Sequence, residues 1–491
     1  MNNSIYKEII LSKSGSQIPV LQNGRTIESK YNPEREADQI IQTFEENSSF
    51  FILNGIGSGI LLKKTSEIFP NAKIIAVEKT QADLDFLSKI NTVSELAANK
   101  NIILTNINEL ENCIIQNYVP ALHGNIKIFE NKAWLNENQD IKDELPNQIQ
   151  AALKKVSADF SVQAHFGKIW QKNILTNLKI FSSVGNKTEG LQPDVNKTAA
   201  IIAAGPTLDD YIEELKTGNY FIIATDTAYS ILQKYNITAD AAVSLDGQSV
   251  SYNHFLEGKK EPSAKTNFFF DLSSNPSTAK KLTEAGNKVS YFVSGHPLSE
   301  YANSFSKNQF LKLYSGSGTV TITALDLALK MGFSKIKVFG ADFSYPKHKP
   351  YAKGSYLDSL YQLAENRLNT SEKQFSKLMF RTELKQTANA VTTTVLESYK
   401  TSFEEYLKAQ GCSFCKNNKV YEITVKKAGA RTLLATTCNF NYSSFLESLK
   451  NGKESEIYLL PYIAWLRKKS KFSDNKYEEF VKLARKSLLK V

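Results

Sequence analysis

Short polar motifs follow several apolar segments and carry most of the potential chemistry of this sequence. Three of them lie close together along the chain: Gly205-Pro206-Thr207, Thr225-Asp226-Thr227 and Ser244-Leu245-Asp246-Gly247. Each comes where an apolar run of strand type ends. In an open parallel sheet, ligands bind outside the carboxyl ends of the strands. We therefore expect Asp226, Thr227 and Asp246 to lie on one polar rim and to line a ligand pocket.

The first motif is typical of an anion-binding turn. Gly205 allows a tight turn, Pro206 fixes the backbone φ angle, and Thr207 can cap a helix predicted over 209–215. Unpaired N–H groups at a helix start, together with the positive end of the helix dipole, favour a phosphate group. The motif predicts a phosphate at this turn.

A second glycine- and hydroxyl-rich turn contains Ser317, Gly318 and Thr319 and leads into a helix predicted over 320–331. Successive backbone N–H groups in such a turn can also hold an anion. Taken alone, either turn is also explained by chain reversal without a ligand.

Candidate acid–base residues follow the next apolar run, 336–339. Asp342 and Tyr345 come directly after it, and His348 and Tyr351 lie on the adjoining loop. These side chains could deprotonate a hydroxyl group or assist the departure of a phosphate. His296, which also follows a strand end, competes with His348 for the role of base. The alternative is that the loop carrying His348 and Tyr351 is merely solvated and plays no catalytic role.

The elements that must position these residues are apolar runs separated by helical or polar stretches. The runs are 199–204, 221–224, 241–245, 267–270, 289–293 and 336–339. This alternation predicts an α/β domain with a largely parallel sheet. A polar Gly- and Pro-containing segment, 182–197, marks a boundary. We expect a Rossmann-like domain over 1–185, a central Rossmann-like domain over 186–355 and a mainly helical region over 356–491.

The N-terminal domain has its own glycine turn, Gly55 to Gly59, between the apolar run 50–53 and a helix over 60–68. A second run, 73–77, ends in Glu78. The order matches half of a dinucleotide- or S-adenosylmethionine-binding fold, with the acid placed to reach a ribose. The full G-x-G-x-x-G pattern is absent. The glycines are equally explained by close packing of strand and helix.

Composition excludes several classes of protein. The 491 residues include 60 Lys and Arg and 50 Asp and Glu, a net charge of +10. This mild surplus favours anionic ligands but lacks the clustered basic stripe of a nucleic-acid binder. No apolar run is long enough to span a bilayer, and the start does not resemble a signal peptide. We expect a cytoplasmic protein that has no membrane span and binds no nucleic acid.

Other common site motifs are missing. The sequence contains no P-loop, H-E-x-x-H or G-x-S-x-G pattern, which disfavours P-loop nucleotidases, zincins and α/β-hydrolases. Cys412 and Cys415 form one C-x-x-C pair, whereas a structural zinc site normally takes four ligands. No Asp-x-Asp motif follows a strand in the central region. We predict that the protein needs no metal ion or cofactor.

Three segments of the central region resemble the motility accessory factor family: IIAAGPTLDDYIEELK, FIIATDTAYSILQKYNITADAAVSLDG and GTVTITALDLALKMGFSKIKVFGADFSYP. Residues 31–37 and 165–170, with Asn173 and Asn177, are also similar to that family. Its members are bacterial flagellin glycosyltransferases whose central domain is shared with bacterial sialyltransferases. The resemblance covers most of residues 30–355.

The resemblance implies transfer of a nonulosonic acid, such as pseudaminic or legionaminic acid, from its CMP conjugate to serine or threonine hydroxyls of flagellin. It places Gly205, Pro206 and Thr207 against the nucleotide, Asp226, Thr227 and Asp246 in the donor pocket, and Ser317, Gly318 and Thr319 at the turn that holds the donor. It gives Asp342, Tyr345, His348 and Tyr351 the leaving-group and base roles. Tyr351-Ala352-Lys353-Gly354 departs from the expected His-Ala-x-Gly, so His348 could substitute as the base.

Two alternatives remain open. An archaeal type of pterin pyrophosphokinase, which uses Mg²⁺ and ATP, shares the same central sequence pattern. A flagellin-binding factor without catalytic activity would keep the pocket only as a relic. Loss of product after replacement of Asp226 or Asp246 by Ala, in a chain that still folds, would favour an enzyme.

Overall fold

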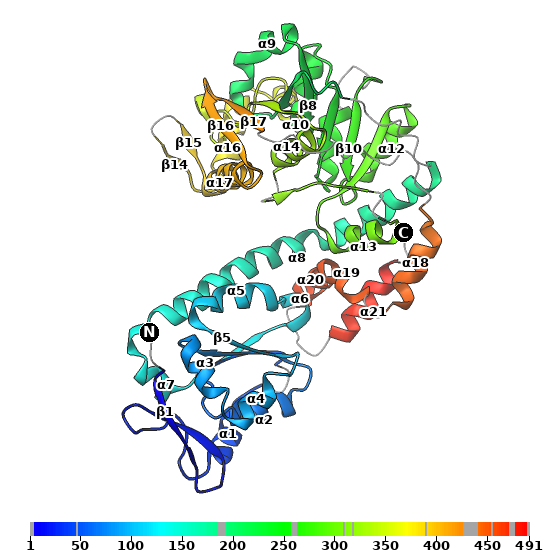
Figure 1. Cartoon of the computed structure of the whole chain (residues 1–491). Helices are drawn as coiled ribbons and strands as arrows, with labels where there is room; N and C mark the ends of the chain where they lie inside the picture. Colours follow the sequence, from blue (N-terminus) through cyan, green and yellow to red (C-terminus); the bar gives the residue numbers. More distant parts are fainter. Residues whose placement is uncertain are drawn as a thin grey trace. The chain divides into compact units, whose positions relative to one another are not determined.

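The chain forms two compact units, each built around a mainly parallel sheet (Figure 1). The computed structural model describes residues 4–45, 48–184, 193–256, 263–307, 310–316, 319–387, 390–425, 440–452, 455–470 and 477–488. One unit comprises residues 1–168 and 459–486, and the other comprises 169–458 and 487–491. The predicted mixed α/β fold with parallel sheets is confirmed.

The first unit contains a four-stranded parallel sheet in the order β5-β4-β3-β6. Its strands are β3 (Phe50–Asn54), β4 (Lys73–Glu78), β5 (Ile102–Asn106) and β6 (Ile126–Glu130). An antiparallel hairpin, β1 (Tyr6–Leu11) and β2 (Gln17–Leu21), precedes it. The helices are α1 (Pro33–Ile41), α2 (Ile60–Ile68), α3 (Gln81–Leu87), α4 (Asn91–Leu96), α5 (Ile107–Asn117), α6 (Pro120–His123), α7 (Lys132–Glu137), α20 (Leu460–Lys469) and α21 (Tyr477–Ser487). The predicted strand, glycine turn, helix and second strand all form.

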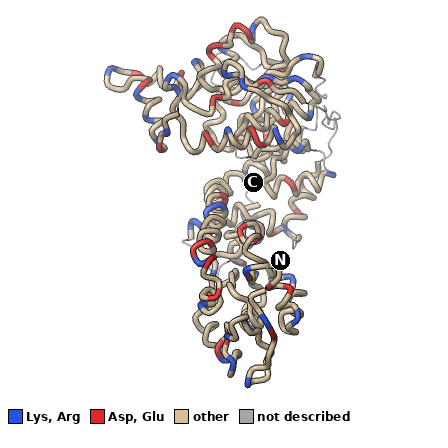
Figure 2. The backbone as a smooth tube through the Cα atoms, turned by 60° about the vertical axis from the view of Figure 1, so that its left-hand side comes forward, with Lys and Arg blue, Asp and Glu red and all other residues tan. Residues whose placement is uncertain are grey.

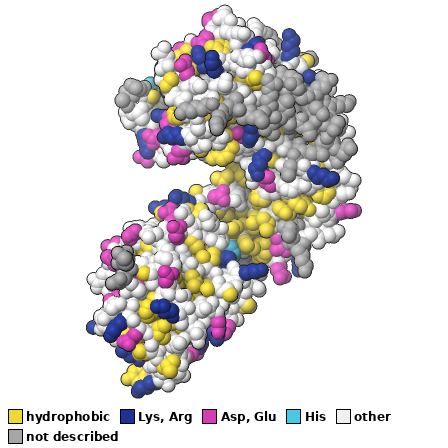
Figure 3. Space-filling model, viewed as in Figure 1, with side chains coloured by type: hydrophobic (Ala, Val, Ile, Leu, Met, Phe, Trp, Pro, Cys, Tyr) yellow, Lys and Arg dark blue, Asp and Glu magenta, His cyan; other side chains and the backbone are white. Residues whose placement is uncertain are grey.

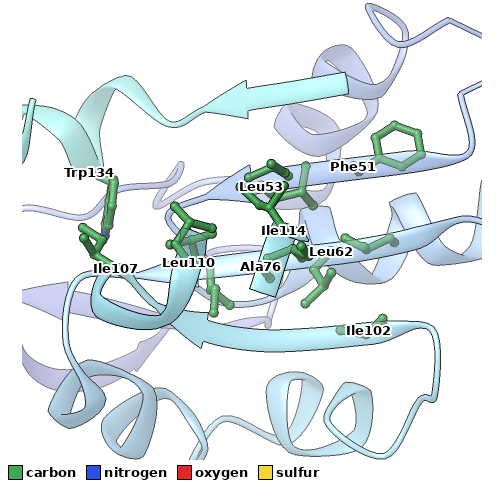
Figure 4. Packing of buried hydrophobic residues seen from close by; sticks show 14 of the residues in the cluster. Phe51, Leu53, Leu62, Ala76, Ile102, Ile107, Leu110, Ile114 and Trp134 are labelled. Atoms are coloured by element: carbon green, nitrogen blue, oxygen red, sulfur yellow. The ribbon is translucent and has the colours of Figure 1, made fainter. Parts of the chain in front are cut away.

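The two central strands, β3 and β4, are buried on both faces of the sheet, which explains why they read as continuous apolar runs. Every residue of β3 is buried. Phe51 and Leu53 from β3 pack with Ala76 of β4, and Leu110 and Ile114 of α5 belong to the same core (Figure 4). These side chains are almost completely removed from water. Their burial is the main favourable contribution to the stability of the unit.

The second unit contains a nine-stranded sheet in the order β12-β11-β10-β9-β8-β7-β13-β17-β16. The parallel strands are β7 (Thr198–Ile202), β8 (Tyr220–Thr225), β9 (Ala241–Ser244), β10 (Asn267–Asp271), β11 (Lys288–Val293), β12 (Leu311–Lys312) and β13 (Lys335–Phe339). Strands β16 (Cys412–Asn417) and β17 (Val420–Val425) extend it antiparallel. All six central strands predicted from apolar runs are present.

The strand order reverses at β7. From β7 the chain adds strands in one direction as far as β12, and then α14 (Val320–Lys330) returns it to place β13 on the other side of β7. The carboxyl ends of β7 and β13 therefore diverge at a topological switch point. In open α/β sheets this is where a crevice for ligands forms.

Helices cover both faces of the larger sheet. On one face, Ile322 and Leu325 of α14 and Phe403 of α17 (Thr394–Ala409) share a core with Phe269 of β10. On the other face, Tyr229 of α10 (Asp226–Lys234) contacts the ring of Phe268. The neighbouring residues Phe268 and Phe269 of β10 therefore face opposite sides of the sheet, and both sides are buried, as is typical of a parallel strand covered by helices on each face.

The remaining helices of this unit surround the sheet. They are α9 (Ile212–Thr217), α11 (Asn253–Leu256), α12 (Pro276–Glu284), α13 (Pro297–Phe305), α15 (Tyr356–Leu363), α16 (Ser371–Met379), α18 (Tyr442–Asn451) and α19 (Ser455–Tyr458). A short hairpin, β14 (Lys385–Gln386) and β15 (Val391–Thr392), lies between α16 and α17.

The 41-residue helix α8 (Glu144–Val184) contributes to both units, and its second half holds the loops of the larger sheet. Asn173 donates from its amide to the carbonyls of Gly247 and Ser273, each at 2.9 Å. Asn177, one turn later, donates to Leu272 and Ser274, also at 2.9 Å. These buried bonds fix the chain that follows β9 and β10.

Two details differ from the sequence-based expectations. The helix predicted over 209–215 begins as a 3₁₀ turn, Pro206–Tyr211, and becomes α-helical only in α9. The two units also divide the chain differently from the three predicted domains. Strands β16 and β17 join the central sheet, whereas Leu459–Lys486 belongs to the unit that contains the N-terminal sheet.

Charge is evenly distributed over the described residues. Among the described residues, lysine and arginine are interspersed with aspartate and glutamate along the backbone of each unit (Figure 2). On the face drawn in Figure 3, charged and apolar side chains are interspersed. Among the helices in the described ranges, none has the length and hydropathy of a membrane span, α8 included.

Candidate functional site

A cavity of about 510 Å³ lies at the switch point of the larger sheet. Its floor is formed by the chain segments that follow β7, β8 and β13, and the first turn of α14 adds a wall. Residues from the end of α16 and the start of α17 complete it. Predicted site residues that line it are Gly205, Asp226, Thr227, Thr319, Asp342, Tyr345 and Tyr351.

The floor depends on the close crossing of two loops. A Cβ atom on Gly340, whose φ is +67°, would lie 2.3 Å from the carbonyl oxygen of Ala203. A Cβ atom on Gly205 would lie 2.4 Å from both the Gly340 carbonyl oxygen and Asp342 Oδ2. Only glycine fits at either crossing point.

Asp342 joins these two loops. Its Oδ2 accepts the backbone N–H of Thr207 at 3.0 Å, and its Oδ1 accepts the Thr207 hydroxyl. Burial raises the pKa of the Asp342 carboxyl, and the bonds from Thr207 oppose that effect. Thr207 is therefore not the predicted helix cap: Gly205 occupies the cap position of the 3₁₀ turn, and the side chain of Thr207 serves Asp342.

Asp226 holds the start of α10 in a similar way. Its Oδ1 accepts the N–H of Thr227 at 2.7 Å, and its Oδ2 accepts the hydroxyl of Ser244 at 2.9 Å. The side chain is buried apart from the part that lines the cavity. The carboxylate supplies negative charge to the positive end of α10.

The start of α14 differs from the other two helix starts. Thr319 occupies the cap position but makes no side-chain capping bond, and the first turn contains no acidic residue. Thr319, Val320 and Thr321 all line the cavity. Asp342 and Asp226 thus bond at the other two starts, whereas the first turn of α14 has no acidic side chain of its own to balance the helix dipole.

Two tyrosines face the same space. Burial, together with the nearby Tyr356, Tyr345 and Asp226, raises the pKa of Tyr351 to about 12. Burial also raises the pKa of Tyr345. Both hydroxyls therefore keep their protons at neutral pH and can donate hydrogen bonds. The Tyr351 loop is tied to the floor, because Ala352 donates its N–H to the carbonyl of Ala204 at 2.9 Å.

Four predicted residues lie outside the cavity lining: Pro206, Thr207, Asp246 and His348. Asp246 bonds within its own loop, where its Oδ1 accepts the N–H of Gln248 at 2.8 Å. His348 is exposed, with φ at +54°, so the structure does not bring it to the cavity as a base. Ser317 and Gly318 lie outside the described residues.

His296, the competing base, caps a helix instead. Its Nδ1 accepts the N–H of Leu298 at 3.2 Å, at the start of α13. Burial lowers the pKa of His296 to about 3, so the imidazole is neutral at physiological pH. It does not line the cavity.

Sequence analysis missed the wall of the cavity that comes from the region after residue 355. The lining residues from this region are Leu378, Arg381, Thr382, Thr393, Val395, Leu396 and Tyr399. No motif marks them, because they follow no central strand and lie far along the chain.

The N-terminal glycine turn is filled by the protein itself. A Cβ atom on Gly55 would lie 2.8 Å from the Trp134 side chain, and one on Gly57 would lie 2.1 Å from Glu28 Oε1. Glu28 also accepts the N–H of Ser58 at 2.9 Å. A protein carboxylate thus occupies the place where a bound phosphate would sit in a nucleotide-binding turn.

Glu78, the predicted ribose-binding acid, is completely buried. It accepts hydrogen bonds from the Tyr6 hydroxyl at 3.0 Å, the Ile56 N–H at 2.7 Å and the Trp134 indole N–H at 2.7 Å. Burial raises the pKa of Glu78 to about 7. The packing interpretation of this turn therefore accounts for the glycines and the acid together.

The fold and cavity define this chain as a mainly parallel α/β protein with a cavity at the switch point of its larger sheet. The model of a family described as 6-hydroxymethylpterin diphosphokinase MptE-like matches residues 170–348. A solved structure, the MAf glycosyltransferase from Magnetospirillum magneticum AMB-1, is 12% identical with a TM-score of 0.47, over 100% of this chain and 91% of that one.

Two curated relatives come from Treponema pallidum (strain Nichols), and both are described as uncharacterized. The first is 37% identical over 140 residues, 28% of this chain and 49% of the relative. The chain thus matches about half the length of that protein. The second is 33% identical over 146 residues, 29% of this chain and 69% of the relative. The chain belongs to the same family as this second Treponema protein.

Proposed function

We propose that this chain is a glycosyltransferase that moves a nonulosonic acid, of the pseudaminic or legionaminic type, from CMP to serine or threonine hydroxyls of flagellin. It would act in the cytoplasm and support flagellar assembly and motility. The observation that carries the proposal is the uncapped start of α14 inside a cavity of about 510 Å³. The sequence resemblance over residues 201–216, 221–247 and 318–346 supports the donor and acceptor classes.

The phosphate of the donor would bind at Thr319 to Thr321. Backbone N–H groups there point along the axis of an 11-residue helix, whose dipole favours negative charge at this end. The carboxylates of Asp226 and Asp342 do not compete for that position, because they accept bonds from Thr227, Ser244 and Thr207. The two carboxylates would instead hold the loops of the cavity floor in position through these hydrogen bonds.

In the reaction, the oxygen of the acceptor hydroxyl forms a bond to the anomeric carbon while the bond from that carbon to the phosphate oxygen breaks. CMP leaves with the bonding electrons, and the hydroxyl proton passes to an oxygen of the departing phosphate. Tyr351 and Tyr345 would donate hydrogen bonds to the departing phosphate. Donors held in place before the reaction lower the barrier because they need no reorganisation. With these donors and the α14 N–H groups, the proposal requires no metal ion.

A protein acceptor agrees with the outer surface near the cavity. Between residues 360 and 395, several large apolar side chains are exposed: Leu360, Leu363, Leu368, Phe380 and Val395. Leu363 and Phe380 are 84% and 71% exposed, and Val395 also lines the cavity. Large apolar side chains that one segment leaves exposed to solvent often contact a partner protein. These residues would contact the flagellin chain around the modified hydroxyl.

The test is transfer by the purified full-length chain, with CMP-pseudaminate or CMP-legionaminate as donor, EDTA present, and flagellin as acceptor. Intact-mass measurement should show a gain of one nonulosonic acid per modified site, with one CMP released for each. Tyr351→Phe should retain CMP affinity and lose about tenfold or more in rate. Flagellin binding without a mass gain would instead indicate a non-catalytic flagellin-binding factor.

A second candidate is favoured by the family match over residues 170–348: a Mg²⁺- and ATP-dependent pterin pyrophosphokinase. The cavity of about 510 Å³ in the larger unit could also accept a nucleoside triphosphate. Incubation with 6-hydroxymethylpterin, ATP and Mg²⁺ distinguishes the two. Formation of AMP and a pterin diphosphate would establish the kinase and exclude the transferase as the primary activity.

A further inference from the structure

Arg381 is a positively charged side chain in a cavity whose other ionisable lining groups are carboxylates and tyrosines. Among the described residues that line the cavity, no other lysine, arginine or histidine is present. Arg381 is exposed to solvent at the cavity wall, and its guanidinium makes no hydrogen bond or ion pair with any part of the chain that the structure describes. Asp226 and Asp342 line the same cavity, but each accepts bonds from neighbouring groups.

The position of Arg381 is linked to the cavity floor. Arg381 follows α16, and the chain then enters the β14–β15 hairpin. From this hairpin, Val391 accepts the N–H of Tyr345 at 2.7 Å, and Thr392 donates its hydroxyl to the carbonyl of Phe343 at 3.0 Å. Both partners belong to the segment that follows β13. The wall that carries Arg381 is therefore attached to the floor that carries Asp342.

A CMP-linked nonulosonic acid has two separate anionic groups, a phosphate and a planar carboxylate. The cavity has two separate sources of positive potential, the uncapped start of α14 and Arg381. A guanidinium matches a carboxylate with two parallel N–H···O bonds, whereas a phosphate is well served by the converging N–H groups of a helix start. Resting on the proposed function, we propose that Arg381 binds the sugar carboxylate and so selects acidic sugars.

The experiment is calorimetric titration of the full-length chain with CMP and with CMP-N-acetylneuraminate, CMP-legionaminate and CMP-pseudaminate. The wild type should bind at least one of these sugar nucleotides more tightly than CMP. Arg381→Met should raise the Kd for that sugar nucleotide by about 10- to 100-fold and leave the Kd for CMP unchanged within about twofold. The affinity of Arg381→Lys for the sugar nucleotide should lie between those of the wild type and Arg381→Met, because lysine keeps the charge but not the two-bond geometry.

Arg367→Met is the matched control, since Arg367 is exposed on the same segment but does not line the cavity. It should change neither affinity. Equal weakening of CMP and sugar nucleotide by Arg381→Met, or weakening of neither, would overturn the carboxylate assignment while the transferase proposal stands. A wild type that binds CMP but no sugar nucleotide more tightly would also overturn it. A wild type that binds none of the four would overturn both.

Discussion

In both sheet-based units of this protein, helices start just after parallel strands, but the groups found at those helix starts differ. In the N-terminal unit, Glu28 and Trp134 fill the space at the turn, and Glu78 is bonded to three protein donors. In the larger unit, two helix starts carry the protein's own carboxylates and the third, α14, does not. A glycine turn therefore indicates a ligand site only when no side chain of the protein occupies it.

The largest expected effect comes from removing the side chain that fills the N-terminal turn. Trp134 is completely buried and donates to Glu78 at 2.7 Å. Trp134→Ala should lower the free energy of unfolding of that unit by about 3–5 kcal/mol, because it leaves a cavity and removes a donor from a buried carboxylate. Thermal or denaturant unfolding measures this loss. Below the unfolding temperature, the affinity for CMP should match the wild type; a large loss of CMP affinity would link the N-terminal turn to the ligand.

A matched pair of glycine substitutions compares the two turns directly. Gly340→Ala would bring Cβ to 2.3 Å from a backbone oxygen at φ +67°, so we expect a loss of more than about 2 kcal/mol and at least tenfold weaker CMP binding. Gly57→Ala meets the ends of two side chains, Glu28 and Ile27, rather than backbone, and side-chain ends can move. Its cost should be about 1–2 kcal/mol, with CMP binding unchanged. Equal losses of CMP affinity in Gly340→Ala and Gly57→Ala would contradict the difference between the two turns.

A smaller effect concerns pH. Burial raises the pKa of the Glu28 carboxyl from 4.5 to about 7, so the folded chain keeps a proton that the unfolded chain releases between these values. The contribution of Glu28 to the free energy of unfolding is therefore most favourable at low pH and decreases as the pH rises toward 7. Glu28→Gln should be nearly neutral at pH 5 and should stabilise the unit by about 1–2 kcal/mol at pH 8.

Melting curves from pH 5 to 8 test this prediction. Because burial also raises the pKa of Glu78 to about 7, the pH dependence should become weaker in Glu28→Gln but should not disappear. Parallel curves for wild type and variant would show that Glu28 is ionised in the folded protein at every pH tested.

The strands can be predicted from the sequence because parallel strands buried on both faces read as apolar runs. The residues at the carboxyl ends of the strands, which form the cavity floor, can be predicted because they directly follow those runs. Asp226 and Tyr351 were placed at the cavity for this reason. Sequence reasoning could not show that Asp342 bonds to Thr207, since residues 135 positions apart meet only in the folded sheet. Arg381 was missed for the same reason. His348 was misplaced because its position depends on backbone torsions that no pattern indicates.

The most direct test of the central claim, that the uncapped start of α14 holds the CMP phosphate, is calorimetric titration of CMP into the wild type, Thr319→Asp and Thr319→Asn. Both substitutions supply a helix cap, but only aspartate adds charge. At an effective dielectric constant of about 20 and a separation of about 5 Å, that charge costs about 3 kcal/mol, on the order of 10² in affinity. We predict that Thr319→Asp loses CMP binding while it melts at or above the wild-type temperature, and that Thr319→Asn binds within about threefold of the wild type. Equal CMP affinity in all three proteins would contradict the account.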